Sequence, residues 1–283
     1  MERLLALIVA FLAAYGAPAE GAALSIVPEP VSQGGTVLVR LVGVASPDSV
    51  ASFTYGGEPV RTMTVRDGEV VGVVGIDLRR PTGTVPVRAV LRNGTMLSGT
   101  STITELSKPE VAFEIPESLG GTTSEAAKTL LTTLASENAV LAGLWTNPKV
   151  LWKEPFRYPV GTPTVTDGYG YTRSTAGTLV AHKGTDFRAA AGTPVYAMNR
   201  GVVRLVRTFR NYGKTIVVDH GQGVQTLYMH LSRVVVGEGT LVSPGQLIAR
   251  SGDTGYTLGA HLHVSVRVQG ISVDPERFLA LWR

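Results

Sequence analysis

The sequence predicts a mainly β protein in which two β regions are joined by a helix. The chain has 283 residues, of which 44% are hydrophobic and 17% charged, so it can bury at least one full core and is expected to form two domains. Its 33 glycines and 16 prolines separate short runs rich in Val, Thr, Ile and Tyr, a pattern typical of short strands and tight turns. One segment near the middle instead has helical spacing.

The first residues are expected to be an export signal. Glu2 and Arg3 precede an apolar run over residues 4–14, and Ala17-Pro18-Ala19 then offers the small-x-small pattern of a cleavage site. The run is shorter than the roughly 20 residues that a membrane-spanning helix needs. We therefore expect residues 1–19 to be removed. The mature protein, with no membrane span, is expected in the periplasm, the cell wall or the extracellular space.

The composition narrows the kinds of site that the chain can form. It has no cysteine, so disulfides and thiolate ligands are excluded and any metal must be held by His, Asp or Glu. The formal net charge of +4 is diffuse, which does not fit a nucleic-acid partner. The sequence carries no signal for an oligomeric state.

Residues 23–105 are predicted to form an immunoglobulin-like β-sandwich. Runs such as residues 36–41 and 85–91 alternate with turn residues, and Asp67-Gly68 and Asn93-Gly94 are hairpin signals. The region contains no histidine. We expect a binding or positioning module, or a spacer that stabilises the fold.

Residues 106–150 are expected to be a linker with one helix, at residues 122–146. Thr122 and Glu125 have the spacing of a capping box, and Asn147-Pro148 marks the end. Apolar residues recur at helical steps in between: Ala127, Leu130, Leu131, Leu134, Leu141 and Leu144. We expect a connector packed on a domain, and an inhibitory plug over an active site is the alternative.

All five histidines lie in the second β region, residues 151–283. His182 and Asp186 form an H-x-x-x-D pattern, and His261 and His263 form an H-x-H pattern. Residues two or four apart in a strand point to the same face, so each pair can present both groups to one site. Catalytic zinc usually takes three protein ligands from His, Asp and Glu and leaves a fourth position for water. Zinc suits such a set better than magnesium or calcium, while manganese, cobalt and iron stay open.

This region resembles the lysostaphin-like, or LytM-type, peptidoglycan endopeptidases, a family of secreted zinc enzymes. The resemblance covers about residues 159–281 and implies a compact antiparallel β fold with its site in a groove walled by loops. It rests on an ordered set of motifs: His182-Lys183-Gly184-Thr185-Asp186-Phe187, Gly192-Thr193-Pro194-Val195-Tyr196-Ala197, Thr226-Leu227-Tyr228-Met229-His230-Leu231-Ser232, Val242-Ser243-Pro244-Gly245-Gln246, Gly252-Asp253-Thr254-Gly255 and Gly259-Ala260-His261-Leu262-His263.

The resemblance implies that His182, Asp186 and His263 are the ligands of a Zn²⁺ ion, and that His230 and His261 are catalytic histidines. We expect His261 to act as the general base and His230 to stabilise the oxyanion. The expected domains are therefore the sandwich, the linker with its helix, and a zinc peptidase domain over residues 151–283.

Three other positions bear on details of the site. His220 matches the family pattern as a turn between strands and is expected to be structural. Val264-Ser265 stands where relatives often carry an aromatic and an acid, and Thr257-Leu258 occupies part of the preceding loop. These departures concern the substrate rather than the metal.

The expected function is zinc-dependent hydrolysis of peptide crosslinks or stem peptides in bacterial peptidoglycan, whose peptides are the expected partner. A glycine bridge and a stem-peptide crosslink are both open as the bond that is cut. The alternative is a non-catalytic LytM-type scaffold, or an activator of another cell-wall hydrolase. A binding protein with coincidental histidines is a further alternative, which a measurement of bound zinc would distinguish.

Overall fold

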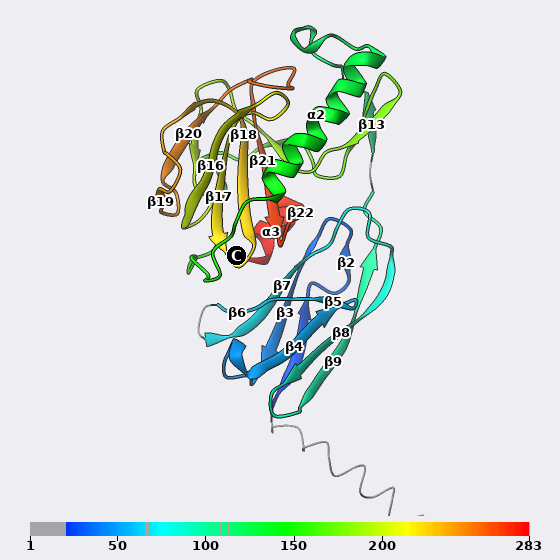
Figure 1. The fold of residues 1–283 in the computed structure, drawn as a ribbon, viewed down its shortest axis with the longest axis vertical. Coiled ribbons are helices and arrows are strands. Elements are labelled where there is room, and N and C mark those ends of the chain that lie inside the picture. The colour runs from blue at the N-terminus through cyan, green and yellow to red at the C-terminus, as the bar shows by residue number, and fades with distance from the viewer. Residues whose placement is uncertain (1–20, 66–67, 108, 113, 283) are drawn as a thin grey trace, which may run out of the picture. The chain divides into compact units, whose positions relative to one another are not determined.

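The structure is a computed structural model that describes residues 21–65, 68–107, 109–112 and 114–282. It confirms the prediction of a mainly β chain, and its elements fall into two compact units (Figure 1). The expected export signal lies outside the described residues. The first unit consists of the described residues up to Val31, Val37–Val74 and Pro81–Thr104. The second consists of Ser32–Thr36, Gly75–Arg80 and the residues from Glu105 onward.

The first unit is a β-sandwich of two sheets. One sheet has the order β1 (Ala23–Val27), β3 (Thr36–Val42), β7 (Val70–Gly75) and β6 (Thr62–Thr64). The other has the order β2 (Val31–Ser32), β9 (Met96–Thr104), β8 (Gly83–Leu91), β4 (Val50–Tyr55) and β5 (Glu58–Pro59).

Two local features of this unit follow from its residues. The β8–β9 hairpin turns at Asn93-Gly94, as the sequence predicts, whereas Asp67 of the other hairpin signal is outside the described residues. The two sheets approach closely at Gly72 on β7, where a Cβ atom would lie 2.1 Å from the ring of Phe53 on β4. Only glycine leaves room for that ring.

The second unit is built on a large sheet in which every strand pairing is antiparallel. Its main path runs through β11 (Val165–Asp167), β14 (Thr185–Arg188), β21 (His261–Val268), β18 (Val224–Val234), β17 (Gly213–Gly221), β16 (Gly201–Phe209) and β19 (Leu241–Val242). Outside this path lie β15 (Pro194–Tyr196), β20 (Leu247–Ser251) and β22 (Ile271–Val273), followed by helix α3 (Pro275–Leu281).

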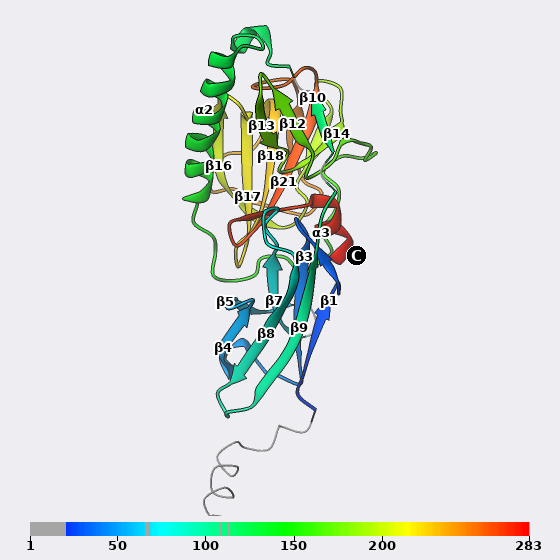
Figure 2. The same ribbon diagram turned by 90° about the vertical axis from the view of Figure 1, so that its right-hand side faces the viewer.

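A smaller sheet stands beside the large one (Figure 2). Strand β12 (Thr172–Thr175) pairs antiparallel with β13 (Thr178–Ala181) and parallel with β10 (Glu110–Ala112). The prediction of an antiparallel domain concerned residues 151–283, and the parallel partner, β10, lies outside them. The parallel pairing draws β10, from the expected linker, into the second unit.

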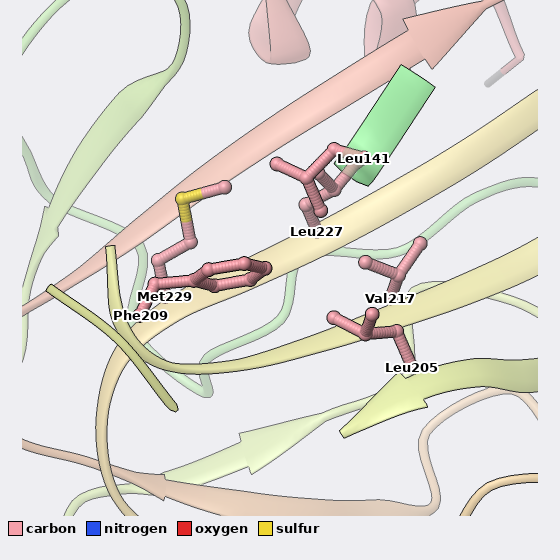
Figure 3. Close-up of a cluster of buried hydrophobic side chains, with 6 residues drawn as sticks. All are labelled: Leu141, Leu205, Phe209, Val217, Leu227 and Met229. Atoms are coloured by element: carbon pink, nitrogen blue, oxygen red, sulfur yellow. The ribbon is translucent and has the colours of Figure 1, made fainter. Parts of the chain in front are cut away.

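Helix α2 (Ser124–Ala142) packs along the large sheet. Its Leu141 is 1% exposed and belongs to a core cluster with side chains of β16, β17 and β18 (Figure 3): Leu205, Phe209, Val217, Leu227 and Met229. Nearer the start of the helix, Ala126 and Ala127 pack with Ile115 in a second cluster. The expectation of a helix packed on a domain agrees with these contacts. The domain boundaries expected at residues 105 and 150 stay predictions.

The start of this helix differs from the prediction. Thr123, not Thr122, is the N-cap, and its hydroxyl accepts a hydrogen bond from the backbone N–H of Ala126. The Thr122 hydroxyl instead accepts a hydrogen bond from the N–H of Ile115, 3.0 Å away. The helix ends at Ala142, with Gly143 as its C-cap, before the expected end at residue 146.

Among the described residues, no helix is long and apolar enough to cross a membrane.

The packing of α2 predicts unequal effects for two of its leucines. Leu141→Ala should lower the free energy of unfolding by about 2–5 kcal/mol, because it leaves a cavity in a buried cluster. Leu131, on the same helix, is 46% exposed, so Leu131→Ala should change the free energy of unfolding by less than about 0.5 kcal/mol. Denaturant titration of both variants tests this. Equal losses would contradict the packing of the helix through Leu141.

Candidate metal centre

Three side chains singled out by the sequence converge at one buried point of the second unit. Asp186 on β14 and His263 on β21 are direct partners in an antiparallel pair, so both side chains leave the same face of the sheet. His182, just after β13, lies beside them. His182 Nε2 is 3.2 Å from Asp186 Oδ1 and 3.1 Å from His263 Nδ1. Asp186 Oδ1 and His263 Nδ1 are 2.7 Å apart.

The turn between His182 and Asp186 requires a glycine. A Cβ atom on Gly184 would lie 2.3 Å from His263 Nε2 and 2.5 Å from the backbone oxygen of Val264. Non-bonded atoms do not approach so closely, so any side chain here would displace the imidazole of His263. The glycine of the H-K-G-T-D motif therefore has a steric role in the site.

Hydrogen bonds on the outer side of the two imidazoles fix their tautomers. His182 Nδ1 donates to the backbone oxygen of Gly168 at 2.7 Å, which leaves a lone pair on Nε2. His263 Nε2 lies 3.0 Å from Ser265 Oγ, and this hydroxyl donates its own proton to the backbone oxygen of Lys183 at 2.9 Å. Ser265 must then accept from His263 Nε2–H. The lone pair on His263 Nδ1 consequently faces the same point as His182 Nε2.

The three converging ligand atoms, from His182, Asp186 and His263, fit a zinc ion. Nitrogen and oxygen ligands lie about 2.0–2.2 Å from zinc, so neighbouring ligand atoms of a tetrahedral site are about 3.3 Å apart. Two of the three separations, 3.1 and 3.2 Å, are close to that value. All three atoms have a lone pair available, and all three residues are buried. Two imidazoles and one carboxylate are a common ligand set of catalytic zinc.

The second carboxylate oxygen of Asp186, Oδ2, accepts a hydrogen bond from an arginine. Arg173 on β12 donates from Nη2 to Asp186 Oδ2 at 2.7 Å, and also pairs with Asp167 on β11. Burial acts to raise the pKa of Asp186, but the charges and hydrogen bonds of His182 and His263 outweigh it and hold that pKa well below its ordinary value. The carboxylate is therefore ionised, as a metal ligand must be.

The other two predicted site histidines lie next to these three groups. The ring centroids of His230 and His261 are 4.8 Å apart, and those of His230 and His263 are 5.9 Å apart. His261 Nε2 lies 3.7 Å from Asp186 Oδ1. The structure thus brings together all five residues that the sequence predicts for the site.

Each of these two histidines donates from Nδ1 to a backbone oxygen. His230 Nδ1 is 2.8 Å from the oxygen of Thr254, and His261 Nδ1 is 2.8 Å from that of Gly259. In the neutral form, each Nε2 therefore carries a lone pair. Burial, and then the neighbouring charges of His261 and His263, lower the pKa of His230 to about 3. His230 is neutral at neutral pH.

The backbone of His230 is unusual. Its φ of +59° lies in the left-handed region, which residues other than glycine rarely adopt. The N–H of His230 donates to the backbone oxygen of Tyr212 at 3.0 Å, and the imidazole is held by Thr254. These two hydrogen bonds maintain the conformation that directs the imidazole toward His261.

His220, expected to be structural, lies apart from this cluster. It is completely buried, with Nδ1 donating to the backbone oxygen of Arg200 at 2.8 Å and Nε2 2.9 Å from Thr226 Oγ1. The ring of Phe156 packs edge-on against it at 5.0 Å. Burial lowers the pKa of His220 to about 4, so this histidine is neutral in the folded protein.

Several residues that support the site carry no sequence signal. Arg173 and Asp167 belong to separate short strands without a motif. Ser265 could have been found, because it follows His263 by two residues on the same strand and therefore shares its face. Nothing in the sequence points to Thr254 as the partner of His230.

A cavity of about 420 Å³ adjoins the histidines and extends along the inner side of α2. One end is lined by His182, His230 and His263, and the walls come from α2, the β12–β13 hairpin and the loop at residues 211–212. Its other lining residues are Arg79, Leu130, Leu131, Leu134, Asn138, Arg173, Thr175, Leu179, Val180, Ala181, Lys183, Asn211, Tyr212, Met229, Tyr256, Ser265, Arg267 and Ser272.

Comparison with known proteins matches residues 180–275 to the family described as Peptidase family M23, a stretch that includes all five histidines. Peptidoglycan DD-endopeptidase ShyB of Vibrio cholerae is 39% identical over 122 residues, which are 42% of this chain and 29% of that protein. Peptidoglycan DD-endopeptidase ShyA of the same organism is 44% identical over 96 residues, 34% of this chain and 22% of that protein. The chain spans less than a third of the length of these curated relatives.

A solved structure resembles the fold over a longer stretch. A crystal structure from Pseudomonas aeruginosa, described as a peptidase M23, has a TM-score of 0.64 and 28% sequence identity. The match covers 89% of this chain and 95% of that chain. It therefore extends well beyond the residues matched to the family and takes in both units.

The buried His220 predicts a component of stability that depends on pH. The unfolded chain protonates this histidine near pH 6.5, whereas the folded protein resists protonation until about pH 4, so acid favours unfolding. The contribution is complete above pH 6.5 and is lost as the pH falls toward 4. Of this contribution, about 2 kcal/mol is lost between pH 7.5 and pH 5.

Urea titrations at pH 7.5 and pH 5 measure this component. The difference in unfolding free energy between the two pH values should be smaller in His220→Gln than in the parent protein by about that amount. An identical pH dependence in both proteins would show that His220 is not protonated on unfolding.

Proposed function

Because residues 180–275 form a Peptidase family M23 domain of the LytM or lysostaphin-like type, we propose that the protein is a zinc metalloendopeptidase that hydrolyses peptides of bacterial peptidoglycan. The observation that carries the proposal is the convergence of His182 Nε2, Asp186 Oδ1 and His263 Nδ1 on one buried point, with two more histidines beside it. The proposed substrate is supported by the relatives named as peptidoglycan DD-endopeptidases.

In this proposal His182, Asp186 and His263 hold the zinc ion. A bound zinc ion acts as a Lewis acid, which polarises a peptide carbonyl and acidifies a water molecule. The protein prepares the ligands in advance. Gly168 and Ser265 set the imidazole tautomers, and Arg173 holds the second oxygen of Asp186.

His261 is the proposed general base. Its Nδ1–H is held by Gly259, so Nε2 can accept a proton from the attacking water and pass it to the leaving amine. His261 is more exposed than His230, so a water molecule can reach its Nε2 more easily.

The role expected for His230, hydrogen bonding to the oxyanion, needs a proton on Nε2. The observed hydrogen bond from Nδ1 to Thr254 and the lowered pKa do not favour that form. We therefore propose that neutral His230 accepts a hydrogen bond at Nε2 from the attacking water and orients it.

Peptidoglycan lies outside the cytoplasm, so the proposal also includes export through the signal expected at residues 1–19.

The proposed roles predict two classes of variant. His182→Ala, Asp186→Ala and His263→Ala should lose zinc on dialysis, because each removes one of three ligands. His230→Ala and His261→Ala should retain zinc but lose about 10² to 10⁴ in rate, the scale of a general acid-base group for His261 and of a misplaced reactant for His230. Metal analysis gives the zinc content, and mass spectrometry of fragments from purified peptidoglycan gives the rate.

Three outcomes would change the proposal. Near-normal digestion by both His230→Ala and His261→Ala would refute the catalytic roles. Loss of zinc from His261→Ala with retention in His263→Ala would reverse the roles of the H-x-H pair. A wild-type protein that binds zinc but releases no fragment from peptidoglycan of any crosslink type would instead be a non-catalytic scaffold or activator.

The hydrogen bond from His263 to Ser265 leads to a separate prediction. Ser265→Ala removes the acceptor that fixes the imidazole tautomer, and zinc affinity should fall about 10- to 100-fold. Ser272→Ala is the control, because Ser272 lines the same cavity on the neighbouring β22. Competition with a chromophoric chelator measures both affinities. Equal affinities in both variants and the parent protein would show that Ser265 does not position the ligand.

A further inference from the structure

Arg267 is a buried cation on the same strand as the candidate metal ligands. Along β21, His261, His263, Ser265 and Arg267 alternate with core residues and point to one face of the sheet. Arg267 is only 7% exposed. Its Nη2 donates to Asn138 Oδ1 on α2 at 3.0 Å, whereas its Nε has no hydrogen-bond partner among the described residues.

The charge of this guanidinium is not balanced by a neighbouring acid. In the part of the chain that the structure describes, no carboxylate pairs with Arg267. Its neighbours on the same face are uncharged, Ser265 along the strand and Gln225 opposite it on β18. Burying a charge without a counter-ion is costly, and arginine is almost never fully buried unless it is paired. Such a residue is poised to receive an anion.

Arg267 also lines the cavity that holds the candidate metal ligands. Among the described lining residues there are four cations, Arg79, Arg173, Lys183 and Arg267, and no aspartate or glutamate. Arg79 pairs with Asp77, and Arg173 pairs with Asp167 and Asp186. Those two charges are compensated within the protein, and Lys183 is exposed to solvent. Arg267 is therefore the buried cation in the wall of the cavity whose charge no carboxylate of the described residues compensates.

We propose that Arg267 and Asn138 form a subsite that binds a carboxylate of the peptide substrate. The inference rests on the proposed function, because it assigns a substrate group to the cavity beside the metal centre. A guanidinium binds a carboxylate through charge-assisted hydrogen bonds with defined geometry, which gives both affinity and register. Arg267 lines the cavity, so its guanidinium can receive the carboxylate there, and Asn138 keeps the guanidinium plane in place.

The position of the subsite limits where the carboxylate lies in the substrate. His263 and Arg267 are four residues apart on one strand, which corresponds to about 13 Å between their backbones. An extended peptide advances about 3.3–3.6 Å per residue. The recognised carboxylate should therefore lie within about four residues of the bond that is cut, so the preferred substrate is an anionic peptide.

Two dye-labelled stem peptides test the subsite, identical except that the carboxylates are free in one and amidated in the other. Fluorescence anisotropy with the zinc-loaded protein gives their affinities, and digestion of the corresponding crosslinked peptides gives kcat/KM. The free acid should bind and react about 10- to 100-fold better than the amide, the scale of a hydrogen bond to a charged group. A ratio near one in the parent protein would refute the subsite.

Three variants distinguish a specific contact from a general field. Arg267→Gln removes the guanidinium, and Asn138→Asp places a carboxylate 3.0 Å from it, where it occupies the donors internally. In both, the ratio of free acid to amide should fall toward one. Arg79→Gln removes an equal charge from the exposed rim of the same cavity and should leave the ratio unchanged. An equal fall in Arg79→Gln would refute the subsite in favour of non-specific attraction.

The two measurements separate this inference from the proposed function. A parent protein that binds the free acid preferentially but hydrolyses neither peptide would leave the subsite standing and refute the proposed hydrolysis. A parent protein that binds and hydrolyses both peptides equally would refute the subsite alone. Asn138→Asp keeps Arg267 and its buried surroundings, so it decides the question if Arg267→Gln fails to fold.

Discussion

The pairing of β14 with β21 is the constraint on which the rest of the site depends. Their register puts Asp186 directly opposite His263, and because side chains alternate along a strand, His261 shares the face of His263. A shift of β21 by one residue would turn His261 and His263 to the opposite face of the sheet, away from Asp186. His182 then needs only a short turn to reach the same point, and the missing side chain of Gly184 in that turn leaves room for the imidazole of His263.

Helix α2 and the β12–β13 hairpin turn this face of the sheet into an enclosed site. The helix is held by an apolar contact at Leu141 and by polar contacts at Glu137, which is 5% exposed and accepts hydrogen bonds from two backbone N–H groups of the 211–212 loop. Enclosure strengthens the electrostatic interactions between the groups of the site, because water screens buried charges poorly. Burial, and then the charges of His261 and His263, lower the pKa of His230 and keep it neutral. Asp186 is ionised in spite of its burial, because His182 and His263 hold its pKa low.

Much of the fold and the candidate site could be predicted because the information is local. Period-two alternation and turn residues predict the strands, and the spacing of the H-x-H motif predicts that His261 and His263 share a face. The prediction that His182 and Asp186 share a face of one strand was wrong, because they meet across the turn at Gly184. The contacts that could not be predicted join distant segments. Glu137 looks like an exposed helix residue in sequence, yet its carboxylate meets Asn211. Likewise, Thr122 is a reasonable helix cap until the N–H of Ile115 uses its hydroxyl, so that Thr123 caps the helix instead.

Tyr212 links the helix to the histidine cluster through its own peptide groups. Its N–H donates to the Glu137 carboxylate on α2, while its carbonyl oxygen accepts the N–H of His230, whose backbone has a positive φ. The backbone conformation of His230 therefore depends on α2, a helix that precedes the large sheet in the chain. Removing that helix would leave all five histidines in the protein, but it would take away the anchor of the loop that keeps one of them in its strained conformation.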